Sequence, residues 1–447
     1  MQMTETLQNF ILGHAEDDVS QLLLNASRYK NINIKAAVEQ IIARRQIKDK
    51  LPSWHNDSRL FYPSTLAAEQ CSSEKTAKYK QRLVSSDDVL CDLTGGLGVD
   101  SYFFSQKVRH VTYVEQDEKY CDAARYNMEM LGASDVCVVN GNAVELATNN
   151  DRRVSDANVF YIDPARRGKS NKRMFAISDC EPDITKIWTF ILNGSDKNPR
   201  DKEAQMSTGL YKQNKVIVKL SPMLDISHVL SQLPEIDEVH VVSVKNDCKE
   251  LLIVASSGGD TCSINLSESV AEQRKGGRLV DFPKNDAEVF CVNYTSEGTE
   301  QLFTFKLSEE HTASVSFATK TGKYLYEPNA SILKAGAYKS VALRYGVEKL
   351  HVNSHLYTSD DFIPLFPGRI FEIADVIPFG NQSCKNLSSE MPQANITARN
   401  FPLSVEDLRK RTRIVDGGDT YLFATILSDN KKVLIKCRKA GIVSIRE

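Results

Sequence analysis

The 447-residue sequence lacks any long apolar run. No segment reaches the roughly 18 uninterrupted apolar residues that a membrane-spanning helix needs. The N-terminal stretch MQMTETLQNF contains neither a basic leader nor a continuous apolar core, which are the marks of a secretory signal. We therefore expect a cytoplasmic protein that is not inserted in a membrane.

Paired cysteines are also absent. The ten cysteines are scattered, none lies in a CxxC pair, and several fall inside apolar, strand-like runs. Structural zinc sites use closely spaced cysteine or histidine pairs, and disulfide frameworks are typical of small secreted domains. The pattern favours reduced thiols in the core, and no metal site is expected.

The sequence has little net charge. Its 56 Lys and Arg residues nearly balance its 58 Asp and Glu residues, so the field of the whole molecule does not indicate a nucleic-acid partner. Local basic stretches lie between Lys30 and Lys50 and from Arg399 onward. Each is equally well explained as a solvated face, because runs of charge usually are.

Helical periodicity marks the first part of the chain. Between residues 4 and 50, apolar residues recur at the spacing of a helix, which predicts a helical N-terminal domain over residues 1–75. Ser72 or Ser73 is predicted to cap the next helix, whose first turn carries Glu74.

Strand-like runs alternate with helical ones from Asp87 to about Ser257. The runs are VLCDL, HVTYVE, DVCVVN, NVFYID, KVIVKLS, EVHVVSV and ELLIVAS. The first five are far enough apart for intervening helices, which predicts an α/β fold with a parallel, doubly wound sheet. Only KNDCK separates the last two, so an antiparallel hairpin is expected at the sheet edge. Dehydrogenase sheets normally end in parallel strands, whereas methyltransferase sheets add a reversed seventh strand.

The pattern changes again after this sheet. The shorter runs EVFCVNYT, QLFTFKL and ASVSFAT precede a helical stretch and another strand. They predict an α+β unit, most simply ferredoxin-like, over residues 258–370. Residues 371–447 are expected to form a fourth small domain, in which Arg409 and Arg411 lie on a basic helix and contact phosphate.

A glycine-rich turn follows the first strand, in the stretch Val89-Leu-Cys-Asp-Leu-Thr-Gly-Gly-Leu-Gly-Val-Asp100. Gly95, Gly96 and Gly98 remove the Cβ atoms that would keep a ligand away from the backbone, and the following helix offers unpaired N–H groups. The pattern is typical of a nucleotide-binding turn. Because such a turn alone is weak evidence, the flanking residues must identify the ligand.

Three polar residues follow successive strands of this sheet. Asp92 ends the first strand, where its carboxylate accepts from an ammonium group but would repel the pyrophosphate of a dinucleotide. Glu115 ends the second strand, where an acid accepts both ribose hydroxyls. Asn142 follows the third strand, where an amide meets an adenine edge. A cationic amino acid joined to an adenosine satisfies all three positions.

At these residues the chain resembles the class I S-adenosylmethionine-dependent methyltransferases. The resemblance covers roughly residues 87–257 and implies a Rossmann-like, seven-stranded sheet in a domain of residues 76–257. Thr94 departs from the commonest motif, which has its first glycine there, but threonine occurs in several RNA-methylating branches. The implied cofactor residues are Asp92, Thr94, Gly95, Gly96, Gly98, Glu115, Asn142 and Asp163.

The fourth strand ends in Asp163-Pro-Ala-Arg-Arg-Gly168, which in this fold faces the transferred methyl group. The motif resembles the DPPY-like motif of enzymes that methylate exocyclic amino groups and the DPAR motif of bacterial rRNA uracil-C5 methyltransferases. The latter require a cysteine nucleophile just before a proline after the fifth strand. The corresponding run, Lys219-Leu-Ser-Pro222, contains no cysteine, so C5 chemistry is disfavoured.

Direct transfer to a nitrogen needs no covalent catalyst. Its barrier falls when the reacting atoms are aligned and the protons of the nucleophile are hydrogen-bonded. Asp163 and the backbone carbonyl of Pro164 are the candidate catalytic groups. Arg166 and Arg167 are candidates for holding phosphate or a base edge, although such a pair is also a common surface feature. Tyr161 is expected in the core.

The whole chain also resembles a group of bacterial methyltransferases with a ferredoxin-like domain and a C-terminal THUMP-like domain. The resemblance is carried by LAAEQCSSEKTAKYK, DLTGGLGVD, IDPARRG, EPNASILKAGAYKS, NSHLYTSDDF and TARNFPLSVEDLRKRTRIVDGGDTYLFAT. It implies an RNA methyltransferase, acting on rRNA or tRNA, whose accessory domains capture RNA. Two other hypotheses stay open: methylation of a protein or metabolite, and a non-catalytic RNA-binding or assembly factor on the same fold.

Overall fold

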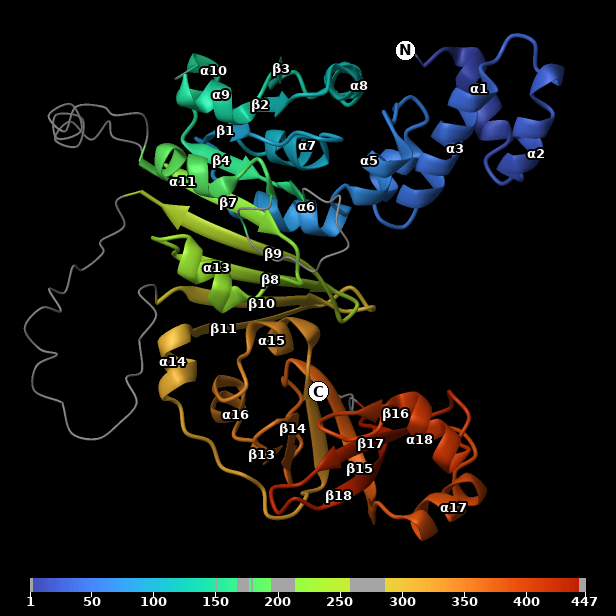
Figure 1. Ribbon diagram of the computed structural model, residues 1–447, viewed down its shortest axis with the longest axis vertical. Helices are drawn as coiled ribbons and strands as arrows, with labels where there is room; N and C mark the ends of the chain where they lie inside the picture. The colour runs from blue at the N-terminus through green and yellow to red at the C-terminus, as the bar shows by residue number, and fades with distance from the viewer. Residues whose placement is uncertain are drawn as a thin grey trace, which may run out of the picture. The chain divides into compact units, whose positions relative to one another are not determined.

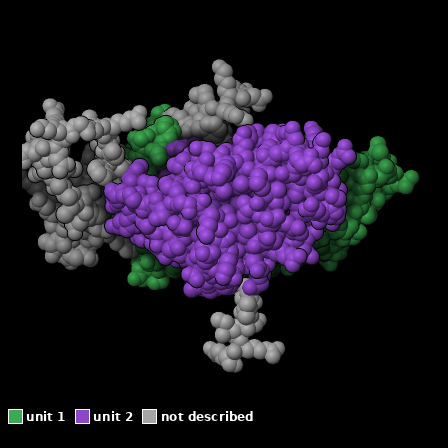
Figure 2. All heavy atoms as spheres, turned by 90° about the horizontal axis from the view of Figure 1, so that it is seen from below, with its two compact units in different colours: residues 1–220, 227–237, 252–279 green, residues 221–226, 238–251, 280–447 purple. Residues whose placement is uncertain are grey.

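The computed structural model describes residues 3–149, 151–166, 177, 180–193, 214–257 and 286–441. It divides into two compact units, coloured separately in Figure 2. Unit 1 comprises Met1–Leu220, Ser227–Asp237 and Leu252–Leu279, and unit 2 comprises Ser221–Ile226, Glu238–Leu251 and Val280–Glu447. Over the described ranges, no helix is long and apolar enough to cross a membrane, and no group of three or more His, Cys, Asp or Glu side chains is placed to hold a metal ion.

Unit 1 begins with a series of short helices (Figure 1). The longest, α3 (Ile34–Ile47), is capped by Asn33, whose side chain accepts a hydrogen bond from the N–H of Ala36. Its apolar residues are buried at helical spacing, which confirms the helical prediction. The other helices are α1 (Glu5–Gly13), α2 (Val19–Leu24), η1 (Ala26–Arg28), α4 (Pro52–Asn56), α5 (Thr65–Gln70) and α6 (Glu74–Gln81).

A buried extended segment fastens these helices to the rest of unit 1. The side chain of Gln40 in α3 donates to the carbonyl O of Tyr62 at 2.7 Å and accepts from its N–H at 2.9 Å. Asn127 in α8 (Glu118–Met130) bonds Phe61 in the same two ways, at 2.7 and 2.8 Å. Burial would otherwise leave these backbone groups unpaired.

Five parallel strands form the centre of unit 1. Their order is β7-β4-β1-β2-β3, which confirms the parallel, doubly wound prediction. The order changes direction at β1, and open α/β sheets bind ligands beyond the carboxyl ends of the strands at such a point. The strands are β1 (Val89–Asp92), β2 (His110–Glu115), β3 (Val136–Asn140), β4 (Val159–Ile162) and β7 (Lys215–Leu220), and the helices with them are α7 (Val99–Ser105), α8, α9 (Ala143–Thr148), α10 (Arg152–Ser155), α11 (Ile184–Asn193) and α13 (Ile226–Gln232).

The predicted hairpin consists of β8 (Glu238–Val244) and β9 (Asp247–Ser256), which are neighbours in the sheet order. Only Lys245 and Asn246 connect them, and both have positive φ, 53° and 61°. Two such residues are what a type I′ turn requires. The antiparallel hairpin is thereby confirmed.

Two further strands continue beyond this hairpin. β10 (Glu288–Tyr294) pairs in parallel with β8, and β11 (Glu300–Lys306) pairs with β10 in antiparallel fashion. The hairpin is therefore not at the sheet edge, and these strands lie outside the ferredoxin-like unit in which we expected them. Apolar alternation identifies a strand but not its partner. The third expected strand, ASVSFAT, makes only an isolated bridge between Phe317 and Lys349.

The remainder of unit 2 is built on a seven-stranded sheet of order β13-β14-β12-β15-β18-β17-β16. Neighbouring strands are antiparallel except β16 and β17. One apolar cluster contains Phe371 and Phe423, and a second contains Leu408 and Leu434. The elements are β12 (Tyr324–Pro328), β13 (Glu348–His351), β14 (Ser354–Ser359), β15 (Gly368–Pro378), β16 (Asn395–Ala398), β17 (Thr420–Ile426), β18 (Lys432–Lys439), α14 (Leu307–Thr312), α15 (Ala330–Ala335), α16 (Ser340–Tyr345), α17 (Asn381–Glu390) and α18 (Val405–Thr412).

We expect Asn127→Ala to lower the free energy of unfolding by about 2–4 kcal/mol, because it leaves the buried N–H and C=O of Phe61 without partners. Urea denaturation followed by tryptophan fluorescence measures this, since Trp54 and Trp188 both belong to unit 1. Asn149→Ala, at an exposed helix end, is the control. Equal stability of the two variants would contradict the role assigned to Asn127.

Candidate active site

The candidate site lies at the carboxyl ends of the strands in unit 1. Asp92, Glu115, Asp163 and Lys219 end or adjoin β1, β2, β4 and β7. Parallel strands bring such residues to one edge of the sheet. The structure therefore brings together three residues predicted from the sequence and adds Lys219, which was not predicted.

Asp92 is almost completely buried, with 1% of its surface exposed. Its Oδ2 accepts from the Ser101 hydroxyl at 2.6 Å, and its Oδ1 accepts from the N–H of Thr94 at 3.0 Å. Burial raises the pKa of this carboxyl to about 7, although both hydrogen bonds favour the charged form. A cationic ligand nearby would favour its ionisation.

The three glycines of the turn have different roles. A Cβ atom on Gly95 would stand 2.2 Å from the ring of Tyr113, so packing alone excludes a side chain there. Gly98 precedes α7 with a φ of 84°. Gly96 also has positive φ, 54°, but the nearest described atom to an added Cβ is the Thr94 carbonyl O at 3.7 Å. Gly96 is thus the position where the backbone is open to a ligand, whereas the sequence pattern predicts such an opening at all three glycines.

Glu115 is held beside Gly96. Its Oε2 accepts the N–H of Gly96 at 3.1 Å, and its Oε1 accepts the N–H groups of Gln116 and Asp117 at 2.7 and 3.0 Å. Each carboxylate oxygen has more than one lone pair, so these bonds leave capacity for a ligand hydroxyl. The position is that of an acid which accepts ribose hydroxyls in such sheets.

Asn142 has a structural role that the sequence pattern does not predict. Its side-chain O accepts from the N–H groups of Val144 at 2.9 Å and Glu145 at 3.2 Å, and so caps α9. The oxygen is committed to the helix. The side-chain NH₂ is the group that remains to donate to a ligand.

Thr94 links the glycine turn to the fourth strand. Its hydroxyl O accepts the N–H of Asp163 at 2.6 Å. Its own N–H donates to Asp92. The commonest motif has a glycine at this position, and a glycine would leave the Asp163 N–H without this acceptor. The hydrogen bond therefore explains why a threonine replaces that glycine in this chain.

Asp163 forms an ion pair with Lys219. The Lys219 Nζ lies 2.5 Å from Oδ2 of Asp163, and the side chains are 13% and 35% exposed. Burial raises the pKa of Asp163, and Lys219 opposes that rise. Pro164 is partly exposed. Arg166 belongs to β5 (Ala165–Arg166), which pairs with β6 (Cys180–Glu181), and Arg167 lies outside the described residues.

A second ion pair is buried nearby. Lys80 of α6 has no exposed surface, and its Nζ lies 3.1 Å from Oδ1 of Asp100 in α7. Oδ2 of Asp100 accepts from the hydroxyls of Ser72 at 2.7 Å and Tyr161 at 2.8 Å. Burial would raise the pKa of Asp100, but Lys80 and Lys219 hold it below its usual value.

Only part of this network could be predicted from the sequence. Tyr161 is buried as predicted, but its hydroxyl is a polar contact that was not foreseen. Ser73, not Ser72, caps α6. The one available signal was Lys80, which shares a helix face with the apolar Ala77 and was therefore a charged residue on a buried side.

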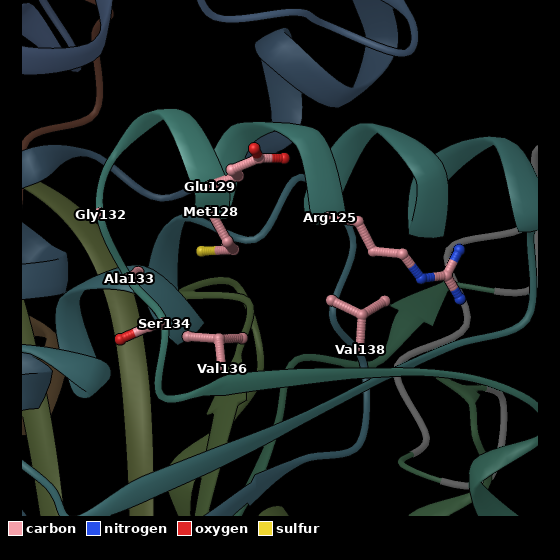
Figure 3. Close-up of a pocket in the computed structure, with 8 residues that line it drawn as sticks. All are labelled: Arg125, Met128, Glu129, Gly132, Ala133, Ser134, Val136 and Val138. Carbon is pink, nitrogen blue, oxygen red and sulfur yellow. The ribbon is translucent and has the colours of Figure 1, made fainter.

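A hollow of about 400 Å³ lies between α8 and β3 (Figure 3). It is formed by the second half of α8, the turn that follows this helix and the first half of β3. It contains no predicted site residue. The lining residues are Arg125, Met128, Glu129, Gly132, Ala133, Ser134, Val136 and Val138.

The two arginines predicted on the basic helix are held by internal contacts. Arg409 pairs with Asp416 and donates to backbone carbonyls. Arg411 donates to the side chain of Asn381. Both lie on α18 in unit 2, whereas Asp163 belongs to unit 1.

The doubly wound sheet, its glycine turn and its reversed hairpin define a methyltransferase-type α/β fold. The crystal structure of a predicted methyltransferase from Porphyromonas gingivalis W83 matches this chain with a TM-score of 0.79 and 32% identity, covering 99% of this chain and 100% of that chain. The chain belongs to the same methyltransferase family.

Family models identify the two C-terminal domain types. A ferredoxin-like domain matches residues 324–367, and a THUMP domain-like model matches residues 368–439. The boundary falls between β14 and β15. Because β12 and β15 pair directly, the two matched regions share one sheet.

More distant solved structures cover about two-fifths of the chain. An rRNA methylase from Streptococcus thermophilus is 10% identical, with a TM-score of 0.28, covering 41% of this chain and 94% of its own. A predicted methyltransferase from Streptococcus mutans in complex with SAH is 12% identical, with a TM-score of 0.28, covering 41% and 96%. Likeness at this level specifies no activity. No match was found among curated proteins.

We expect Thr94→Ala to lower the free energy of unfolding by about 1–2 kcal/mol, because the N–H of Asp163 loses its acceptor. Thr94→Ser keeps the hydroxyl and should stay within about 0.5 kcal/mol of the unaltered protein. Urea denaturation of the cofactor-free protein measures both. Equal losses in the two variants would show that the hydroxyl is not responsible.

We expect Asp92 to make the protein less stable as pH rises from about 4 to 7. Its pKa of about 7 in the folded state lies above the usual 3.8, so the folded state keeps a proton that the unfolded state loses. The free energy of unfolding should fall by up to about 4 kcal/mol across this window and then level off. Asp92→Asn removes this contribution, so the difference between the two proteins at pH 5 and pH 8 measures it. A difference that does not depend on pH would contradict the assignment.

Proposed function

We propose that this protein is an S-adenosylmethionine-dependent methyltransferase that methylates a base nitrogen in structured RNA, either rRNA or tRNA. The observation that carries the proposal is the position of Asp163. It is tied to the glycine turn through Thr94 and paired with Lys219, so an acceptor carboxylate stands beside the cofactor turn.

The residues of the turn suit this cofactor. Gly96 presents open backbone, Glu115 lies beside it, and Asp92 supplies a buried carboxyl. S-adenosylmethionine supplies an electrophilic methyl group on a positively charged sulfur. We assign its binding to Asp92, Thr94, Gly95, Gly96, Gly98, Glu115, Asn142 and Asp163.

The site favours nitrogen chemistry over C5 methylation. Of the described cysteines, Cys71 is within electrostatic reach of Lys219 and Asp100, but burial raises the pKa of its thiol. A covalent mechanism needs a thiolate. Asp163 and the carbonyl of Pro164 can instead accept hydrogen bonds from an amino group and align it for direct transfer.

The THUMP domain-like match supports RNA as the substrate. We assign residues 1–75 to a helical domain, 76–257 to the methyltransferase domain and 371–447 to a THUMP-like domain. The ferredoxin-like domain then lies within residues 258–370 without β10 and β11, which continue the sheet that contains β8. Arg166, Arg167, Arg409 and Arg411 remain candidate RNA contacts. Arg409 would then act through the part of its side chain that Asp416 leaves exposed.

Incubation with radiolabelled S-adenosylmethionine tests the proposal. Total RNA and total protein from a strain lacking the gene are supplied as substrates. We expect label in RNA, and we expect Asp163→Ala to reduce it by about 100-fold or more even at saturating cofactor concentration. Nucleoside mass spectrometry of the labelled RNA then identifies the base.

Asp122→Ala is the matched control, because Asp122 is an exposed acid of α8 in the same unit. If label enters only protein or small molecules, the substrate belongs to one of those classes and is not RNA. Cofactor binding with no transfer to any fraction would favour a non-catalytic RNA-binding factor. Full activity of Asp163→Ala would remove Asp163 from the mechanism.

A further inference from the structure

Lys219 and Asp163 occupy the same level of neighbouring strands. β4 and β7 are parallel, and their register pairs Ile162 with Val218. The next residue on each side is Asp163 or Lys219, so both reach the carboxyl edge where ligands bind in such sheets. A lysine side chain that is only 13% exposed is uncommon. Its position at the ligand-binding edge indicates a role in the reaction, because a lysine that serves only solubility would be exposed to solvent.

The contacts of Asp163 leave one of its oxygens available. Lys219 Nζ holds Oδ2 at 2.5 Å, and the hydroxyl of Thr94 holds the backbone N–H at 2.6 Å. Within the described part of the chain, no group donates a hydrogen bond to Oδ1. The carboxylate is thus anchored at two points and presents its second oxygen as an acceptor.

We propose that Lys219 is the positioning residue that holds Asp163 as a charged acceptor for the nitrogen that receives the methyl group; this role rests on the methyltransferase function proposed above. A carboxylate accepts hydrogen bonds but donates none. It therefore selects a nitrogen that carries hydrogen and repels a ring nitrogen that offers only a lone pair. The substrate class narrows to bases with an exocyclic amino group.

The pair also accounts for the proton released in the reaction. The amino nitrogen forms a bond to the methyl carbon, while the carbon–sulfur bond breaks and its electron pair stays on sulfur. The nitrogen then carries one hydrogen too many. An N–H bond breaks, and the proton passes to Oδ1 of Asp163. Lys219 stays protonated and stabilises the carboxylate before this transfer.

The other charged groups near Asp163 do not replace Lys219. Asp100 raises the pKa of Asp163 and Lys80 lowers it, but these two form an ion pair at 3.1 Å, so their effects largely cancel. Asp92 is a further acid within electrostatic reach. Removal of Lys219 therefore leaves Asp163 among acids without its own cation.

A carboxyl ¹³C titration of the cofactor-free protein tests the role of Lys219 without any reaction. Asp163→Asn identifies the signal. We expect Lys219→Met to raise the pKa of Asp163 by about one to three units and Lys219→Arg to leave it nearly unchanged. Lys219→Gln replaces the methionine variant if that variant does not fold. An unmoved Asp163 titration in the neutral variant overturns the proposal.

Lys215→Met is the matched control for this titration. Lys215 lies on the same strand, but its Nζ donates to the Leu83 carbonyl O at 3.0 Å. Loss of its charge should leave the Asp163 signal in place. If Lys215→Met shifts the pKa of Asp163 as much as Lys219→Met does, direct contact with Lys219 is not what sets that pKa. This result would overturn the proposal.

The pH dependence of kcat/KM for methyl transfer to RNA gives the second readout. In Lys219→Met the acidic limb should move to higher pH, with activity at pH 7 reduced about 10- to 100-fold and largely regained in alkali. A uniform reduction at every pH would indicate a merely structural role and overturn the proposal. Absence of transfer by the unaltered protein would overturn the proposed function instead, and the carboxyl titration would still decide the role of Lys219.

Discussion

The arrangement of the site depends on the burial of opposite charges at one edge of a sheet. Each buried ion would cost several kcal/mol if it stood alone. The pairs Lys80–Asp100 and Lys219–Asp163 offset this cost by direct contact. Asp92 has no cation at contact distance among the described residues, and its pKa is the one that rises to about 7. With all groups ionised the cluster carries one excess negative charge, which suits a cationic ligand.

The cluster can form only if segments far apart in the sequence are fixed together. Lys80 comes from α6, Asp100 from α7 and Lys219 from β7. Gln40 and Asn127 fasten the N-terminal helices to α8 through the backbone of the intervening segment. The helical region is thus a support of the site, because it leads directly into the helix that carries Lys80.

The sequence predicted the features that depend on local pattern. Asp92, Glu115 and Asp163 were found because each ends a strand of a recognisable sheet. The sequence gives Lys219 no role of its own, and the run that begins with it is notable only because it lacks a cysteine. A single sequence does not show which residue of β7 lies beside the end of β4. Pairing between distant segments has no local signature, and for the same reason the sequence pattern predicts β10 and β11 in the ferredoxin-like sheet, whereas they extend the sheet that contains β8.

Charge patterns were the least informative part of the sequence. Arg44 lies in the first basic stretch, yet it is 7% exposed, and its guanidinium donates to backbone carbonyls between His55 and Leu60. Arg409 is likewise occupied by Asp416. In the sequence, an arginine that donates hydrogen bonds to buried carbonyl groups cannot be distinguished from one that binds phosphate. Only the structure separates the two.

The same reasoning changes how the C-terminal region is understood. Glu327 of β12 is 2% exposed and pairs with Arg369 of β15 and with Arg399, which follows β16. The first lies in the ferredoxin-like match and the other two in the THUMP domain-like match. A buried carboxylate shared by two guanidiniums, together with a continuous sheet, makes separate folding of the two regions costly. They are better regarded as one module, so any binding surface on one of them is positioned by both.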